Sequence, residues 1–207
     1  MPGMAANPKI FEFLNFSKKV KVIHLSWIDP YENESLSNYA KRMCKYIKHK
    51  NPILLGVSFG GILVQEMAKY IECRKTIIVS SIKSKKEMSR IMKINRVLGI
   101  HKLIPFKSIK NLETLILFSF GFSMKKKILM YQKYLTLRDP KYLSWAINSI
   151  VNWEGSVPSK KLIHIHGNED KIFRINRILD PYIEIEGDHA IILTRFEWFN
   201  DYLSKII

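Results

Sequence analysis

Short apolar runs alternate with longer amphipathic stretches along the 207 residues of the chain. Short runs rich in Val, Ile and Leu predict strands, and they cover residues 20–25, 53–57, 75–80, 162–166 and 182–186. The last run, Tyr-Ile-Glu-Ile-Glu, is less apolar and predicts a strand nearer an edge. Apolar residues at helical spacing predict helices over 35–48, 59–72 and 191–206. Strands that alternate with helices are typical of a parallel sheet covered on both faces, so we expect a three-layer α/β/α sandwich.

The alternation stops between about residues 83 and 157, where no run predicts a strand. This segment is basic and contains several helical patterns. One of them begins at Asp139-Pro140, where Asp suits the N-cap and Pro suits the first helical position. We expect a single domain over residues 1–207, with a helical cap inserted at about 83–157, after the third predicted strand. Within the cap, residues 115–122 predict either a buried helix or the apolar roof of a pocket.

The chain is strongly basic, with 34 Lys and Arg residues against 18 Asp and Glu residues and a formal net charge of +16. A concentrated basic patch would favour a nucleic acid, a membrane surface or an acidic carrier as partner. Here the cations are spread along the chain, and the runs 83–86 and 125–127 are short and lack interleaved aromatic residues. We therefore expect the lysines mainly to solvate the surface, with no nucleic-acid partner. Docking of an acidic carrier or coenzyme A stays an alternative use of the charge.

The two cysteines and the first residues of the sequence indicate in which cellular compartment the protein is expected. Cys44 and Cys73 have no metal-ligand spacing, so we expect neither a metal site nor a disulfide. Met1-Pro-Gly-Met lacks the basic start and apolar stretch of a signal peptide. No run approaches the roughly 18 apolar residues of a membrane span. These features predict a cytoplasmic protein without a transmembrane segment.

Residues 53–61 (ILLGVSFGG) place Ser58 where a predicted strand turns into a predicted helix. Such a turn needs small residues, here Gly56 and Gly60, because the strand end and the helix start crowd each other. A serine there is exposed for nucleophilic attack. The Phe59 N–H lies at the helix N-terminus, where it can bind a developing oxyanion, and its side chain is a candidate pocket wall. Taken alone, the same glycines would also suit a turn needed only for packing.

A nucleophilic serine needs a histidine as base and an acid that orients it. His189 is the best candidate because it follows the last predicted strand, at the sheet edge where sites form in parallel α/β proteins. The other histidines lie in or at the end of predicted strands, in the basic end of a helix or in the cap: His24, His49, His101, His164 and His166. Asp170 is the candidate acid because it leaves the fourth predicted strand at the same edge. Glu169 and Glu87 are its rivals, and we expect a structural role for His166.

Ser58, Asp170 and His189 follow one another in the order nucleophile, acid, base. In this order the whole chain resembles the α/β-hydrolases, through the motifs GVSFGG (56–61), HGNED (166–170) and EGDH (186–189). The resemblance implies a mostly parallel sheet of this type, a cap after the third strand and a catalytic triad that requires no metal or organic cofactor.

Pro2-Gly3-Met4 resembles the loop that gives these hydrolases their second oxyanion-hole N–H. The resemblance therefore implies that the Met4 and Phe59 N–H groups bind the oxyanion together. Such a loop follows an early strand, for which the sequence has no residues ahead of Met1. We expect an N-terminally shortened form of the fold.

The resemblance implies a serine hydrolase that cleaves an ester, thioester or related acyl bond of a small substrate through an acyl-enzyme. One alternative is an acyltransferase or carrier-dependent thioesterase that uses the basic charge for docking. Another is a non-catalytic binding protein on the same fold.

Overall fold

A parallel sheet lies at the centre of the computed structural model, which describes residues 1–90, 92–94, 129, 132–155 and 161–207. Four strands pair in the order β1-β2-β3-β4, and every pair is parallel. Their bounds are Ile53–Val57 for β1, Lys75–Val79 for β2, Leu162–Gly167 for β3 and Ile183–Ile185 for β4. The pattern predicted all four strands, and it placed β4 correctly at an edge.

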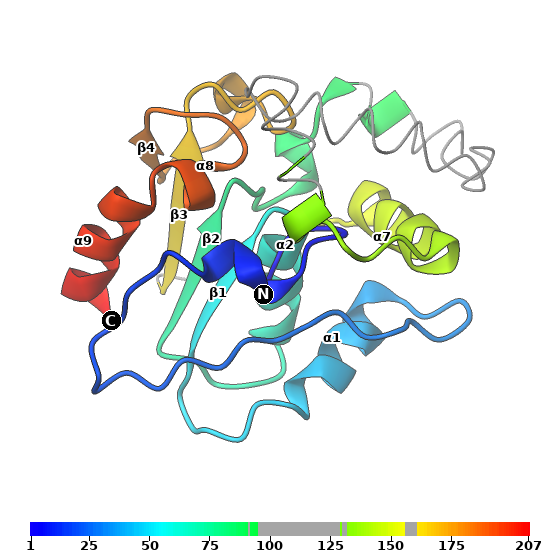
Figure 1. Cartoon of the computed structure of the whole chain (residues 1–207). Helices are drawn as coiled ribbons and strands as arrows, with labels where there is room; N and C mark the ends of the chain where they lie inside the picture. Colours follow the sequence, from blue (N-terminus) through cyan, green and yellow to red (C-terminus); the bar gives the residue numbers. More distant parts are fainter. Residues whose placement is uncertain (91, 95–128, 130–131, 156–160) are drawn as a thin grey trace.

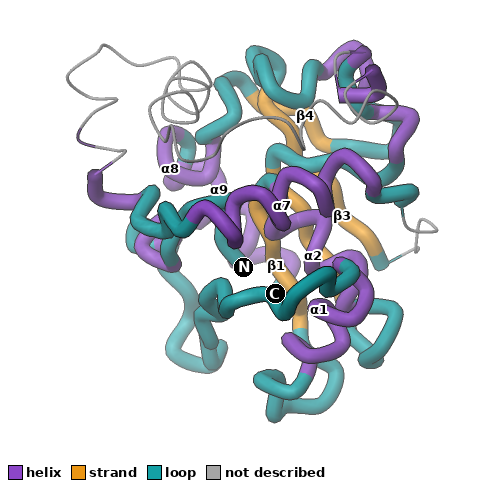
Figure 2. Tube along the Cα trace, turned by 90° about the vertical axis from the view of Figure 1, so that its right-hand side faces the viewer, coloured by secondary structure: helices purple, strands orange, loops and turns teal. Residues whose placement is uncertain are grey.

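Helices cover both faces of this sheet (Figures 1 and 2). One face packs against α1 (Leu36–Cys44), α2 (Phe59–Met67) and α7 (Pro140–Asn152). The other packs against the 3₁₀ helix η1 (Pro8–Phe11) and against α8 (Ile191–Thr194) and α9 (Phe196–Ile206). Successive residues of β2 alternate between the two cores, so that Ile78 joins the first and Ile77 joins the second. The three-layer sandwich is confirmed. Two further 3₁₀ turns are η2 (Lys85–Glu87) and η3 (Ile175–Arg177).

The prediction of a strand over residues 20–25 is wrong, because no strand forms there. A cavity of about 620 Å³ separates this segment from β1, and both line it. The β-branched residues that gave the prediction still favour an extended backbone, but a strand needs a neighbour within hydrogen-bonding distance. The segment has none, so it stays irregular.

Met1 occupies the outer edge of β1 instead. Its amino group donates to the Leu55 carbonyl oxygen at 2.6 Å, and the Val57 N–H donates to the Met1 carbonyl oxygen at 3.1 Å. These two bonds flank Gly56 as in a parallel strand pair. Met1 is buried, and burial lowers the pKa of its amino group to about 5. This pairing places the residues that follow Met1 beside the end of β1.

The helices follow the predictions with three differences, the first of which is that the helix predicted over 35–48 ends at Cys44. Asp139 accepts from the Tyr142 N–H at 2.8 Å and Pro140 opens α7, as predicted. The helix predicted over 191–206 is split into α8 and α9 at Arg195, whose φ of −122° and ψ of 30° are not helical. The helix predicted over 59–72 ends at Met67. Residues 115–122 lie outside the described part of the chain, so the expectations for them are untested.

No helix within the described ranges is long and apolar enough to cross a bilayer.

Candidate active site

Ser58 lies at the turn between β1 and α2, in a backbone conformation that is rare for a residue with a side chain. Its φ is 53° and its ψ is −120°. Two hydrogen bonds hold it there: the Ser58 N–H donates to the Val79 carbonyl oxygen at 2.9 Å, and the Ser81 hydroxyl donates to the Ser58 carbonyl oxygen at 2.8 Å. A Cβ atom at Gly56 would collide with the Gly60 carbonyl. The turn is therefore as tight as the glycine spacing predicted.

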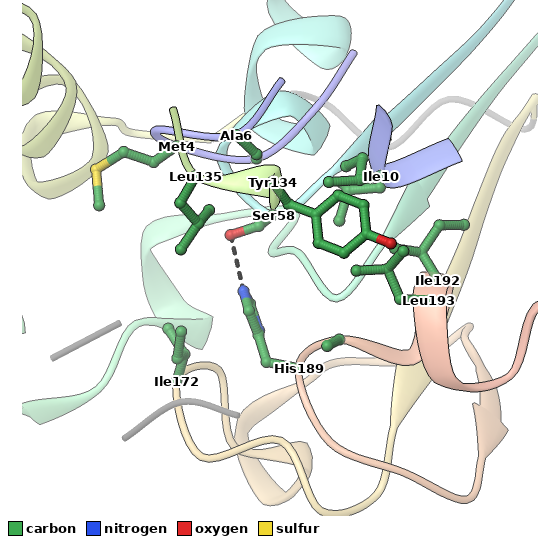
Figure 3. Close-up of a pocket in the computed structure, with 13 residues that line it drawn as sticks. Met4, Ala6, Ile10, Ser58, Tyr134, Leu135, Ile172, His189, Ile192 and Leu193 are labelled. Atoms are coloured by element: carbon green, nitrogen blue, oxygen red, sulfur yellow. Dashed lines mark hydrogen bonds between the residues drawn. The ribbon is translucent and has the colours of Figure 1, made fainter. Parts of the chain in front are cut away.

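His189 and Asp170 meet Ser58 at the carboxyl ends of the strands, and Figure 3 shows the contact between Ser58 and His189. The Ser58 Oγ lies 2.9 Å from His189 Nε2, and His189 Nδ1 lies 2.7 Å from Asp170 Oδ2. A carboxylate only accepts, so Nδ1 carries the hydrogen and Nε2 is left to accept from the serine hydroxyl. The structure thus brings together the three side chains singled out from the sequence. It excludes Glu169, which is exposed.

The Asp170 carboxylate is almost fully buried, with 3% of the residue exposed. Its Oδ1 accepts from the N–H groups of Ile172 and Phe173 at 2.8 and 2.9 Å. Burial alone would raise the pKa of Asp170. The charge and hydrogen bond of His189, the nearby His166 and the Phe173 N–H together outweigh burial and hold that pKa below its ordinary value. Asp170 is therefore built to remain a carboxylate beside His189.

A second acid, Glu87, is also buried, but it does not face His189. It accepts from the Leu179 N–H at 2.8 Å and from the Lys83 N–H. Its Oε1 also lies 3.8 Å from the Lys83 ammonium. Glu87 thus ties the chain after β2 to the chain before β4, and it is excluded as the partner of His189.

An apolar cavity of about 100 Å³ opens beside Ser58 and His189. Its walls include η1, the bridge between Ala6 and Leu135, α8 and, from the loop after β3, Ile172. The lining includes Ile10, Tyr134, Leu135 and Ile192. None of these was identified from the sequence, because each is an ordinary apolar residue that reaches the site only through long-range contacts.

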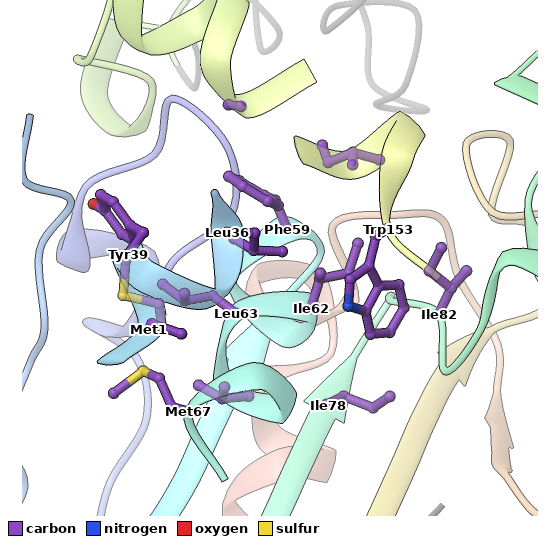
Figure 4. Packing of buried hydrophobic residues seen from close by; sticks show 14 of the residues in the cluster. Met1, Leu36, Tyr39, Phe59, Ile62, Leu63, Met67, Ile78, Ile82 and Trp153 are labelled. Carbon is purple, nitrogen blue, oxygen red and sulfur yellow. The ribbon is translucent and has the colours of Figure 1, made fainter. Parts of the chain in front are cut away.

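The Phe59 side chain is not a pocket wall, contrary to the sequence expectation. It is fully buried in the core beneath α7 (Figure 4) and stacks on Trp27 at 4.8 Å between ring centroids. A residue that opens a helix directly after the turn has its side chain directed into the packing between the helices. Its backbone lies next to Ser58, which is compatible with the other predicted role, that of its N–H group in binding the oxyanion.

The segment Pro2-Gly3-Met4 lies beside Ser58, as the resemblance implied. A Cβ atom at Gly3 would lie 3.4 Å from the Ser58 Cβ, and Met4 lines the cavity. The Trp27 indole N–H donates to the Gly3 carbonyl oxygen at 2.8 Å and so holds the segment in place. Sequence reasoning missed Trp27, which lies in an irregular segment without any local pattern.

The described residues contain no cluster of three or more His, Cys, Asp or Glu side chains that could hold a metal ion.

Comparisons of the whole chain give structural matches only. No protein-family model matches it, and no curated protein matches it either. Among solved structures, a hydrolase from Oleispira antarctica has a TM-score of 0.73 at 12% identity, covering 99% of this chain and 88% of that one. A thermophilic esterase from Thermogutta terrifontis has a TM-score of 0.68 at 12% identity, with coverages of 99% and 88%.

A thioesterase of the prodiginine biosynthetic pathway in Streptomyces coelicolor is also similar, with a TM-score of 0.67 at 14% identity and coverages of 100% and 83%. These identities are low, so the likeness is one of architecture. The parallel sheet, its helical layers and these full-length matches together establish that the chain has the α/β-hydrolase fold.

Proposed function

We propose that the protein is a serine hydrolase that cleaves an ester, thioester or related acyl bond of a small substrate through an acyl-enzyme. The observation that carries the proposal is the unbroken line of hydrogen bonds from Ser58 through His189 to buried Asp170, at the mouth of an apolar cavity. A histidine between a serine hydroxyl and a buried carboxylate is the arrangement that activates a serine for acyl transfer.

The proposed reaction has two halves. Ser58 Oγ attacks the substrate carbonyl while its proton passes to His189 Nε2, and Asp170 stabilises the imidazolium that forms. The N–H groups of Phe59 and Met4 bind the oxyanion. The leaving alcohol or thiol takes the proton from His189. Water then attacks the acyl-enzyme with His189 as base, which releases the carboxylic acid and restores Ser58.

The cavity suggests which part of the substrate is held. Its lining is almost wholly apolar, so it suits the hydrocarbon part of an acyl group. A cavity of about 150 Å³ can hold benzene, and this one is smaller, at about 100 Å³. We therefore propose short acyl groups as substrates.

A chain-length series of p-nitrophenyl esters tests the proposal. It compares the wild type with Ser58→Ala and with the control variant Ser204→Ala, which changes a serine in α9. We expect turnover to be greatest for short acyl chains, to be lost in Ser58→Ala and to be kept in Ser204→Ala. A fluorophosphonate probe should label the wild type at Ser58. Equal turnover in wild type and Ser58→Ala would refute the mechanism, and absence of labelling would favour a non-catalytic binding protein.

A carrier-dependent thioesterase or acyltransferase is the second candidate, supported by the net charge of +16 and by the thioesterase among the structural matches. Its cations would dock an acidic carrier or coenzyme A. Turnover of carrier-linked or coenzyme A thioesters should then fall steeply with salt, whereas turnover of simple thioesters should not. A preference for simple esters that salt leaves unchanged would exclude this candidate.

A further inference from the structure

Two more histidines lie next to the candidate acid, buried in β3. His166 is fully buried and His164 is 2% exposed. The Nε2 atom of His166 lies 2.7 Å from the Phe173 carbonyl oxygen and 3.4 Å from Asp170 Oδ2, the oxygen that faces His189. Its Nδ1 atom lies 3.1 Å from His164 Nε2. A chain of imidazoles therefore ends on the same carboxylate as His189.

The chemistry of the partners determines which nitrogens carry hydrogen. A carbonyl oxygen only accepts, so His166 Nε2 must donate to Phe173. A neutral His166 then has a bare Nδ1, which accepts from His164 Nε2–H. Both rings stay neutral in this arrangement, because burial lowers the pKa of each, to about 2 for His164. The His166 N–H is thereby directed toward the Phe173 carbonyl, with Asp170 Oδ2 3.4 Å from the same nitrogen.

The charged groups around this pair come from three segments. Asp170 belongs to the loop after β3, and His189 to the loop after β4. Lys83 follows β2, and its ammonium donates to the Pro181 carbonyl oxygen at 3.0 Å and lies 3.8 Å from Glu87. Lys83 therefore opposes a second positive charge on either buried ring. The pair is consequently suited to donate a fixed N–H and unsuited to take up the Ser58 proton.

We propose that His166, held in one tautomer by the Phe173 carbonyl and supported at Nδ1 by His164, is a positioning residue that fixes the Asp170 carboxylate for His189. The inference rests on the proposed hydrolase function and deepens it. His166 ties the loop at Phe173 to β3, and the same loop supplies both backbone donors to Asp170 Oδ1. The positive end of the His166 N–H dipole also lies near Asp170 Oδ2 and partly offsets its negative charge. The carboxylate therefore attracts the imidazolium of His189 less strongly.

Two substitutions at His166 test the proposal. His166→Leu removes the donor, whereas His166→Gln keeps an N–H that can reach Phe173 and Asp170. For His166→Leu we expect kcat to fall at least tenfold with KM little changed. We also expect the acid limb of the kcat/KM profile to move to higher pH, because the full carboxylate charge then faces His189. His166→Gln should restore both kcat and the pH profile, a rescue that a loss of packing alone would not show.

Heteronuclear NMR of the imidazole nitrogens gives a readout that does not depend on activity. In the wild type, His164 and His166 should both be neutral with hydrogen on Nε2 at neutral pH, and the nitrogen shifts of His189 should change in His166→Leu, because the carboxylate that faces His189 then loses a nearby donor. If His166→Leu does not fold, His164→Leu serves instead: it removes the donor to His166 Nδ1 and should change the nitrogen shift of that atom, and His164→Gln is its control.

The role of His166 and the hydrolase function can be refuted separately. Ser58-dependent turnover with identical kcat and pH profile in His166→Leu would overturn the role of His166 and leave the hydrolase proposal standing. Absence of turnover in the wild type would overturn the hydrolase proposal. The nitrogen shifts of His189 would in that case still decide whether His166 acts on the Asp170–His189 pair, and an Nδ1–H tautomer of His166 in the wild type would show that it does not.

Discussion

The buried amino group of Met1 should make the free energy of unfolding depend on pH. Its pKa falls from 8.0 in the unfolded chain to about 5 in the folded protein. Between these values the unfolded state binds more protons, so stability should rise with pH from about 5 to about 8 and fall as the solution is acidified. The lowered pKa corresponds to about 4 kcal/mol, of which roughly 1–2 kcal/mol falls between pH 8 and pH 6.5.

Between pH 6.5 and pH 8 the expected change in the free energy of unfolding comes mainly from Met1 and not from the buried histidines. Burial lowers the pKa of His164 from 6.5 to about 2, so its destabilising protonation acts in the same direction but at lower pH. A variant with Gly-Ser added before Met1 isolates the amine. In that variant a peptide N–H replaces the amino group and can donate to the same Leu55 carbonyl oxygen.

Urea unfolding followed by tryptophan fluorescence at pH 6.5 and pH 8 is the assay, with intact mass used to verify that Met1 is present. We expect the unextended protein to lose roughly 1–2 kcal/mol between pH 8 and pH 6.5, and the extended variant to change much less. If the two proteins lose the same free energy over this interval, the amine is not buried in the folded state and the description of the β1 edge is wrong.

Three further substitutions test the contacts around Ser58. Gly60→Ala should lower the free energy of unfolding by about 1–3 kcal/mol, because its Cβ would collide with the Met1 and Pro2 carbonyls; an unchanged melting temperature would contradict this. Trp27→Phe keeps a ring but loses the bond to Gly3, so kcat should fall more than KM rises, whereas Trp198→Phe on α9 should leave both unchanged. Leu135→Ala enlarges the cavity and should shift the preferred p-nitrophenyl ester to a longer acyl chain, with exposed Leu179→Ala as control; an unchanged chain-length preference would remove Leu135 from the acyl pocket.

The sequence predicted the parts of the fold that depend on local pattern. The continuous apolar runs of β1 and β2 are recognisable because both their faces are buried. The positions of Asp170 and His189 followed from one geometric rule, since parallel strands bring their carboxyl ends to the same edge. The contact of the three side chains could therefore be expected before their distances were known.

Features that depend on a distant partner could not be predicted in this way. Residues 20–25 have the composition of a strand, but strand formation depends on a neighbour that the pattern does not reveal. The pocket walls at Ile10 and Leu135 and the Trp27 contact to Gly3 join segments far apart in sequence. The tautomers inferred for His164 and His166 depend on their distances to each other and to Phe173, which the sequence does not reveal.

The outer edge of β1 has a consequence for how the protein behaves at high concentration. Beyond the two bonds to Met1, this edge has no strand partner in the described chain and faces the groove lined by residues 20–25, where Val22 and Ile23 are exposed. Such an edge can pair with another extended chain. The same groove carries Lys19, Lys21 and Lys50, whose like charges repel a second copy. Salt screens this repulsion, so we expect self-association to increase with ionic strength, and concentrated solutions to remain monomeric longest in dilute buffer.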